Sequence, residues 1–296
     1  MLLKTFESRR CGWEMYPTRW GFLITLVLAC TVGCGPEASF PEEVEQLGST
    51  TQAQSLIVDN GLNLNGLNLN GLSTSAFNSW FQADPTLRKE IMKYVVACGV
   101  ASGESRTYTV PGTSTTYTWQ GVLGLAPSWA SGNAATTVEQ QVVSACMAAH
   151  TNKFGIHVNI SLLGLNGAGN AIPYTSQELT DYATREACFF GNLFDGSTGT
   201  FGANDGLSLA SNESTARVCG IAGSGVSVSQ CSPMVYVGSC STYCTRDSTN
   251  TFYTSCSYNG VTYRPITTRM RTQDIHRCGD GVCQATESSG TCAADC

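Results

Sequence analysis

The sequence predicts an α+β fold: a single disulfide-rich globular domain with three main helices and short antiparallel strands, plus a small C-terminal cysteine-rich module. Three observations predict it. Twelve of the 15 cysteines follow position 34, and an even number in an exported chain is typical of a disulfide framework. Apolar residues recur at helical spacing in three segments. Other segments are rich in Thr, Tyr and Trp and alternate in polarity, which indicates strands.

An export signal precedes this domain. Residues 21–29 are an uncharged apolar run of the length of a signal-peptide core, about 7 to 15 residues, and a transmembrane helix needs roughly 20. Thr31-Val-Gly-Cys34 resembles the lipobox of bacterial lipoprotein signals, which implies that Cys34 is acylated. Val27-Leu-Ala-Cys30 is a competing lipobox, and an ordinary secretory signal is the alternative. Gly35, with no Asp there, resembles lipoproteins sorted to the outer membrane.

Residues 1–34 are therefore assigned to a lipoprotein signal peptide, and residues 35–57 to a polar, acidic linker. Residues 58–73 repeat Asn-Gly-Leu-Asn-Leu with a period of five and resemble pentapeptide repeats. Fewer than three copies are too few to stack as an independent unit. We expect an extended segment laid against the domain, or else a template for assembly with another chain.

The charge balance excludes one class of partner. Residues 1–34 hold four of the 16 basic and two of the 22 acidic residues, so the mature chain has a net charge of −8. A basic patch is the usual footprint of a nucleic-acid site, and the sequence has no basic run. We expect no nucleic-acid partner.

The predicted domain spans residues 74–272. Helices are expected at 73–98, 136–151 and 177–193, with Asp84-Pro85 as a start signal in the first. Strands are expected at 106–110, 115–122 and 156–163, and strand and turn from 216 to 270. Asn259-Gly260 predicts a hairpin turn. A domain break at 200–214 is the alternative to one continuous domain.

The twelve mature cysteines are expected to form six disulfides. They are Cys98, Cys146, Cys188, Cys219, Cys231, Cys240, Cys244, Cys256, Cys278, Cys283, Cys292 and Cys296. We expect Cys98 to pair with Cys146 and Cys244 with Cys256, and the last four to pair among themselves. A zinc site is the weaker interpretation, because the sequence has no Cys-x-x-Cys unit.

The C-terminal segment 273–296 has the one recognisable spacing. Its Cys-Gly-Asp-Gly-Val-Cys…Glu…Cys-Ala-Ala-Asp-Cys pattern resembles cysteine-rich modules of secreted bacterial proteins and, more distantly, Lin12/Notch repeats. The resemblance implies a calcium site formed by Asp280, Glu287 and Asp295, since calcium takes oxygen ligands. The alternative is a disulfide knot without calcium. No other cofactor is expected.

The sequence contains few residue patterns that indicate catalysis. The sequence has no Gly-x-Ser-x-Gly, His-Glu-x-x-His or Walker motif. Cys146 and His150 would share one helix face, but a thiol in an oxidising compartment is more often half of a disulfide. Glu139 with Glu178, Asp181 or Glu186 could form a glycosidase carboxylate pair, but scattered acids are usually solvated surface residues. A glycan-binding platform could consist of Trp80, Trp119, Trp129, Phe189 and Phe190, but buried core is the more frequent role of such aromatics.

Together the signal, the Asn-Gly-Leu repeats and the C-terminal module make the chain similar to myxobacterial-type lipoproteins. That resemblance implies location and architecture. We expect a lipid-anchored cell-envelope protein that is a non-enzymatic binding module for a protein or glycan partner. The alternatives are a secreted hydrolase with an unfamiliar site and a structural envelope component.

Overall fold

The structure is a computed structural model, which describes residues 72, 74–151, 158–195, 199–205, 234–275, 278, 283 and 287–296. The signal segment, the linker and all of the repeats except Leu72 lie outside the described residues. The predicted α+β fold is confirmed, because helices and mainly antiparallel strands both contribute to the domain. Among these residues, no helix has the length and apolarity that crossing a membrane requires.

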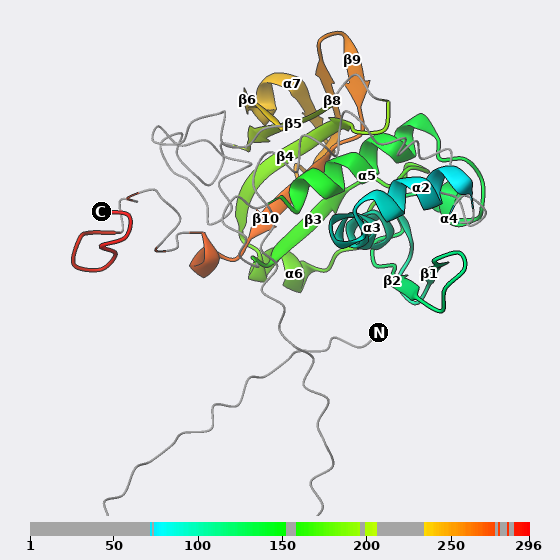
Figure 1. Ribbon diagram of the computed structural model, residues 1–296. Helices are drawn as coiled ribbons and strands as arrows, with labels where there is room; N and C mark the ends of the chain where they lie inside the picture. The colour runs from blue at the N-terminus through cyan, green and yellow to red at the C-terminus, as the bar shows by residue number, and fades with distance from the viewer. Residues whose placement is uncertain are drawn as a thin grey trace, which may run out of the picture. The chain divides into compact units, whose positions relative to one another are not determined.

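A five-stranded sheet is the centre of the domain (Figure 1). Its strands, in spatial order, are β3 (Ile160–Gly164), β10 (Ile266–Met270), β4 (Thr184–Asn192), β5 (Gly199–Asn204) and β6 (Val235–Ser239). Only β5 and β6 run parallel to each other; the other neighbours are antiparallel. The sheet therefore joins chain segments that are more than a hundred residues apart, since Met270 pairs with Ile160.

The first expected helix is two helices, α2 (Ser75–Ala83) and α3 (Pro85–Gly99). The break lies at Asp84, whose φ of −155° and ψ of 82° are not helical. Proline disfavours the helical conformation of the residue before it. Asp84 also caps α3, because its Oδ1 accepts the N–H of Leu87 at 3.1 Å.

The second expected helix is confirmed as α5 (Thr137–Ala149). Thr136 and Glu139 form a capping box at its N-terminus, in which each side chain accepts the other residue's N–H. Figure 1 shows α5 lying along β4 and β10 on one face of the sheet. The predicted bond between Cys98 and Cys146 is present and joins α3 to α5. It closes a loop of 48 residues, which stabilises by about 4 kcal/mol on the loop-entropy model.

The third expected helix, 177–193, is wrong. Only α6 (Ser176–Asp181) is helical there, and the rest is the central strand β4. Ala187 and Phe189 pack in the main core under α5, whereas Cys188 and Phe190 pack on the opposite face. A strand buried on both faces is a continuous apolar run, which periodicity alone does not distinguish from a buried helix.

A second, smaller core covers that opposite face. It consists of Cys188, Phe190, Phe201, Ala203, Cys240, Tyr253, Cys256 and Tyr263. Its outer layer is α7 (Cys240–Tyr243) and a three-stranded sheet of β7 (Cys244–Arg246), β8 (Tyr253–Tyr258) and β9 (Val261–Tyr263). The Asn259-Gly260 turn is confirmed between β8 and β9, with φ values of 49° and 78°.

The two strands expected before α5 are also present, as the hairpin β1 (Ser105–Thr109) and β2 (Thr116–Gln120). A short helix, α4 (Pro127–Ala130), follows. The hairpin buries Tyr108 and Trp119 and exposes its threonines. Trp80 and Trp129 are buried as well. The tryptophans are therefore core residues, and the glycan-platform interpretation is wrong for them and for the buried Phe189 and Phe190.

Five disulfides join described cysteines. Besides Cys98–Cys146 they are Cys188–Cys240, Cys244–Cys256, Cys278–Cys292 and Cys283–Cys296. The expected Cys244–Cys256 bond is thus present, and the four C-terminal cysteines pair among themselves. Cys219 and Cys231 lie outside the described residues. Disulfides persist in oxidising compartments, so the protein is extracytoplasmic.

Candidate functional site

A hollow of about 380 Å³ opens beside β3, on the side of the helices. This volume lies within the range of small-ligand pockets, about 300 to 1,000 Å³. Seven apolar residues line it: Ala97, Val122, Leu123, Ile160, Leu162, Ile172 and Pro173. Three polar residues, His150, Ser161 and Glu178, complete the wall. Seven of the ten lining residues are thus apolar, and the other three supply hydrogen-bonding groups.

One wall is built by the end of α3. The last carbonyl groups of a helix have no hydrogen-bond donors within the helix. At the end of α3, the backbone N–H groups of residues 122–126 are the donors. The N–H groups of Val122 and Leu123 both donate to Ala97 O, at 3.1 and 2.9 Å. Gly121 makes this approach possible, because a Cβ there would lie 2.4 Å from the carbonyl oxygen of Ala101. Val122 is left 57% exposed at the hollow.

The opposite wall is β3 and the segment that returns from it. Ile160 and Leu162 share one face of the strand, since strand side chains alternate. The N–H of Ile172 donates to Gly164 O at 2.9 Å, which places Ile172 and Pro173 beside the strand. Ser161 Oγ donates to Glu178 Oε1 at 2.8 Å. Glu178 is in the first turn of α6, where Thr175 caps the helix.

His150 ends α5 and lines the same hollow. Its Nδ1 lies 2.8 Å from the carbonyl oxygen of Cys146. A carbonyl only accepts hydrogen bonds, so Nδ1 carries a proton, and in the neutral ring Nε2 is an acceptor. The ring also packs against Tyr94, with centroids 5.3 Å apart. The backbone and Tyr94 therefore fix the imidazole at the rim of the hollow.

The catalytic pairs considered from the sequence do not form. Cys146 is bonded to Cys98, so it offers no thiolate to His150. Glu139 is 1% exposed and accepts the N–H groups of Ser128 and Thr136, at 2.6 and 2.8 Å. It is thus a capping residue of α5. Glu178 alone of the four acids considered lines the hollow.

The remaining predicted site residues are only partly placed. Cys34 and Asp280 lie outside the described residues. Asp295 Oδ2 lies 3.2 Å from Cys292 Sγ in the C-terminal module, and Glu287 is half-buried. The calcium site and the lipidation of Cys34 therefore stay predictions.

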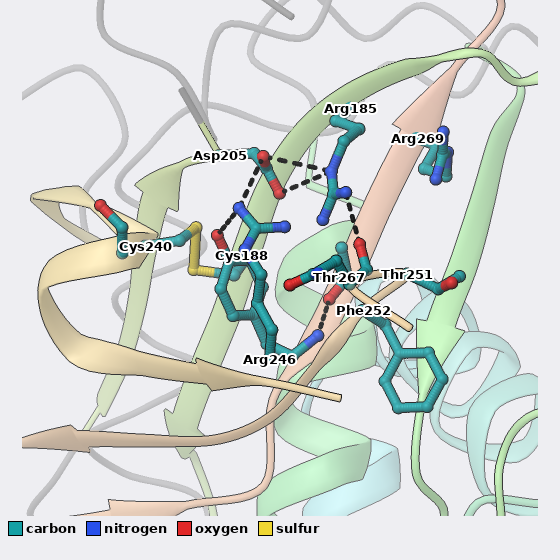
Figure 2. Close-up of polar contacts among 12 residues, drawn as sticks. Arg185, Cys188, Asp205, Cys240, Arg246, Thr251, Phe252, Thr267 and Arg269 are labelled. Carbon is teal, nitrogen blue, oxygen red and sulfur yellow. Dashed lines mark hydrogen bonds and ion pairs between the residues drawn. A yellow bond between two sulfur atoms is a disulfide. The ribbon is translucent and has the colours of Figure 1, made fainter. Parts of the chain in front are cut away.

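A buried ionic cluster was missed by sequence reasoning (Figure 2). Asp205 follows β5 and is 2% exposed. Its carboxylate meets Arg185 of β4, with Nε at 3.3 Å, and Arg246 of β7, with Nη2 at 3.2 Å. The Arg246 guanidinium also lies 4.4 Å from the centre of the Tyr253 ring. Burial, followed by the charge of Asp205, raises the pKa of Tyr253.

The cluster connects the two sheets of the domain. Arg185 lies in the central sheet and Asp205 directly follows its strand β5, whereas Arg246 and Tyr253 belong to the outer sheet. Arg269 of β10 is close enough that burial, and then the charge of Arg185, lower the pKa of its guanidinium. No local pattern marks these residues, because the nearest charge partners are 20 and 41 positions apart in the chain.

The turn that follows β7 is organised by a second carboxylate. Asp247 accepts the N–H groups of Thr249, Thr251 and Phe252, at 3.0, 2.7 and 3.0 Å. Burial raises the pKa of Asp247, but the hydrogen bonds from Thr249, Phe252 and Thr251 outweigh burial and lower the pKa below its ordinary value. The ionised carboxylate therefore stabilises the β7–β8 connection.

The fold assembles both the hollow and the ionic cluster from distant segments of the chain. Comparisons of the chain with protein-family models, curated proteins and solved structures find no match.

Proposed function

We propose that this chain is a lipid-anchored protein of the outer membrane whose domain binds a partner protein without catalysing a reaction. The lipobox-like sequence ending at Cys34 and the polar linker 35–57 support the anchor. The disulfides of the domain agree with exposure to an oxidising compartment. The resemblance to myxobacterial-type lipoproteins supports the same location and architecture.

The observation that carries the binding function is the hollow beside β3. Its seven apolar residues favour an apolar group of the partner, and the exposed Val122 extends that surface outward. The Glu178 carboxylate and the acidic net charge favour a cation next to that group. A peptide segment that combines an apolar side chain with Lys or Arg has this chemistry.

A protein partner is favoured over a glycan. A glycan platform requires exposed aromatic rings, whereas Trp80, Trp119 and Trp129 are each at most 7% exposed. Hydrolysis is the competing function, since Ser161, Glu178 and His150 line one hollow. Against it, the hydroxyl of Ser161 donates to Glu178 and the Nδ1 of His150 faces a backbone carbonyl, so the three residues do not form a Ser-His-acid triad.

The test is a selection of displayed peptides on the soluble mature protein, followed by calorimetry of the selected peptides. Val122→Arg places a charge in the mouth of the hollow at an exposed position. Val261→Arg is the matched control, because Val261 is 45% exposed on β9 and does not line the hollow. We expect Val122→Arg to lose binding and Val261→Arg to retain it.

Two results would overturn the proposal. One is that selected peptides bind the wild type and Val122→Arg equally well. The other is turnover of an ester, peptide or glycoside panel by the wild type that disappears in Glu178→Gln. A glycan array probed in parallel distinguishes a sugar ligand, which would replace the protein partner if its binding also depended on Val122.

A further inference from the structure

Four disulfide sulfurs lie in one cluster between the central sheet and the outer sheet. Cys188 of β4 is bonded to Cys240, the first residue of α7. Cys244, the first residue of β7, is bonded to Cys256 of β8. The Sγ atoms of Cys188 and Cys244 belong to different disulfides and are only 3.6 Å apart. The two bonds are therefore in contact, and Figure 2 shows the Cys188–Cys240 bond between the strand and α7.

The four cysteines of this cluster differ in solvent exposure. Cys188 and Cys240 are 0% exposed and Cys256 is 1% exposed, whereas Cys244 is half-buried. Cys244 is thus the most exposed residue of the four, and we take it as the point of entry for an external thiol. The bond between Cys98 and Cys146 differs on this point, because both of its cysteines are 0% exposed.

We propose that the cluster is a thiol–disulfide relay in which Cys244 passes a reduction from the surface to the buried Cys188–Cys240 bond. An external dithiol attacks Cys244 Sγ, which breaks the Cys244–Cys256 bond and releases Cys256 as a thiolate. The second thiol of the reductant then displaces Cys244, and the reductant leaves as its own disulfide. Two electrons have passed to the protein, and Cys256 takes a proton from solvent.

The second step is an exchange that needs no further reductant. The Cys244 thiolate attacks Cys188 Sγ, forms the Cys188–Cys244 bond and releases Cys240 as a thiolate, which takes a proton. For this step the attacking Cys244 Sγ and the attacked Cys188 Sγ must approach from 3.6 Å to about 2.05 Å, the length of a disulfide bond. The carbonyl oxygen of Ala203 lies 3.1 Å from Cys240 Sγ and accepts the S–H of the released thiol.

The exchange changes which element is tied to the central strand. Before it, α7 is bonded to β4 and β7 is bonded to β8. Afterwards β7 is bonded to β4, while α7 no longer has a disulfide to β4. The protein therefore has two covalent states of its second core, and the external reductant selects between them. This relay does not depend on the proposed binding function.

Graded reduction of the native mature protein tests the relay. The protein is treated with a limiting amount of dithiothreitol, alkylated and mapped by mass spectrometry. We expect a Cys188–Cys244 cross-link with Cys240 and Cys256 alkylated, while Cys98–Cys146 stays intact. The proposal is overturned if Cys244 and Cys256 are both alkylated while Cys188–Cys240 persists.

Single-residue variants test whether the Cys188–Cys244 bond forms when the bonding partner of either cysteine is removed. Cys256→Ser frees Cys244, and Cys240→Ser frees Cys188, so each should contain the Cys188–Cys244 bond without added reductant. Cys244→Ser is the control, since it should keep Cys188–Cys240 and lose the cross-link at every reductant concentration. A free Cys244 beside an intact Cys188–Cys240 bond in Cys256→Ser would contradict the relay.

Discussion

Asp205→Asn should destabilise the domain severely, because it removes a buried negative charge that contacts two partly buried guanidinium groups. The carboxylate contacts Arg185 at 3.3 Å and Arg246 at 3.2 Å, and Asp205 itself is 2% exposed. Removing one partner of a buried ion pair lowers the free energy of unfolding by about 3 to 5 kcal/mol. The arginine side chains keep 13% and 17% exposure, and this hydration favours the lower end, about 3 kcal/mol.

The assay is thermal unfolding followed by circular dichroism at neutral pH with the disulfides intact. Each kcal/mol shifts Tm by about 2 to 4 °C in a domain of this size, so we expect a fall of about 6 to 12 °C. Glu104→Gln is the matched control, because it removes an ion pair at 3.5 Å in which Glu104 is 53% exposed. There Arg106 keeps its bonds to Ser105 O and Ala130 O, and a surface pair contributes about 0 to 1 kcal/mol. The same fall in Tm for both variants would refute the reasoning.

Three further predictions concern the anchor, the acid range and calcium. Cys34→Ser should move the protein from the outer-membrane fraction to a soluble or precursor form; the same result from Cys30→Ser alone would assign the lipidation to Cys30. Asp247→Ala should lower the free energy of unfolding by about 1 kcal/mol at neutral pH, as loss of a cap does. The folded state lowers the pKa of Asp247, so its carboxylate stabilises the fold above the ordinary pKa of 3.8, and this stabilisation is lost as the pH falls through the folded-state pKa. The free energies of unfolding of the variant and the wild type should therefore converge in acid. Parallel acid-unfolding curves would contradict this role of Asp247. Calcium should shift the NMR signals of Asp280 and Glu287 with an affinity of about 10⁻⁴ to 10⁻³ M, and no shift up to about 10 mM would leave the disulfide-only module.

Local signals in the sequence were reliable where they act within a few residues. Thr136 and Glu139 bond to each other's backbone, so the start of α5 was predictable without knowledge of the fold. Asn259 and Gly260 adopt positive φ angles that their residue types accept readily. Asp84-Pro85 was a correct start signal, although the expected single helix is two, since the proline also ends α2.

The same reasoning failed where burial decides the structure. Residues 186–192 are buried on both faces of the sheet, because α5 covers one side and the second core covers the other. A helix and a doubly buried strand have the same apolar composition in such a run. The choice between them was made by pairing with β10 and β5, which lie far away in the chain.

The sequence by itself determined the disulfide-rich α+β class, the start of α3, the start of α5 and the hairpin turn, because each depends on composition or on neighbours in the chain. It also predicted two disulfides, Cys98–Cys146 and Cys244–Cys256, between segments whose elements were recognisable. Only the tertiary structure decided the hollow beside β3, the contacts of Asp205 and the meeting of two disulfides at Cys188 and Cys244. These features join residues separated by 20 to 81 positions, and no local energy term relates such residues until sheet pairing and core packing bring them together.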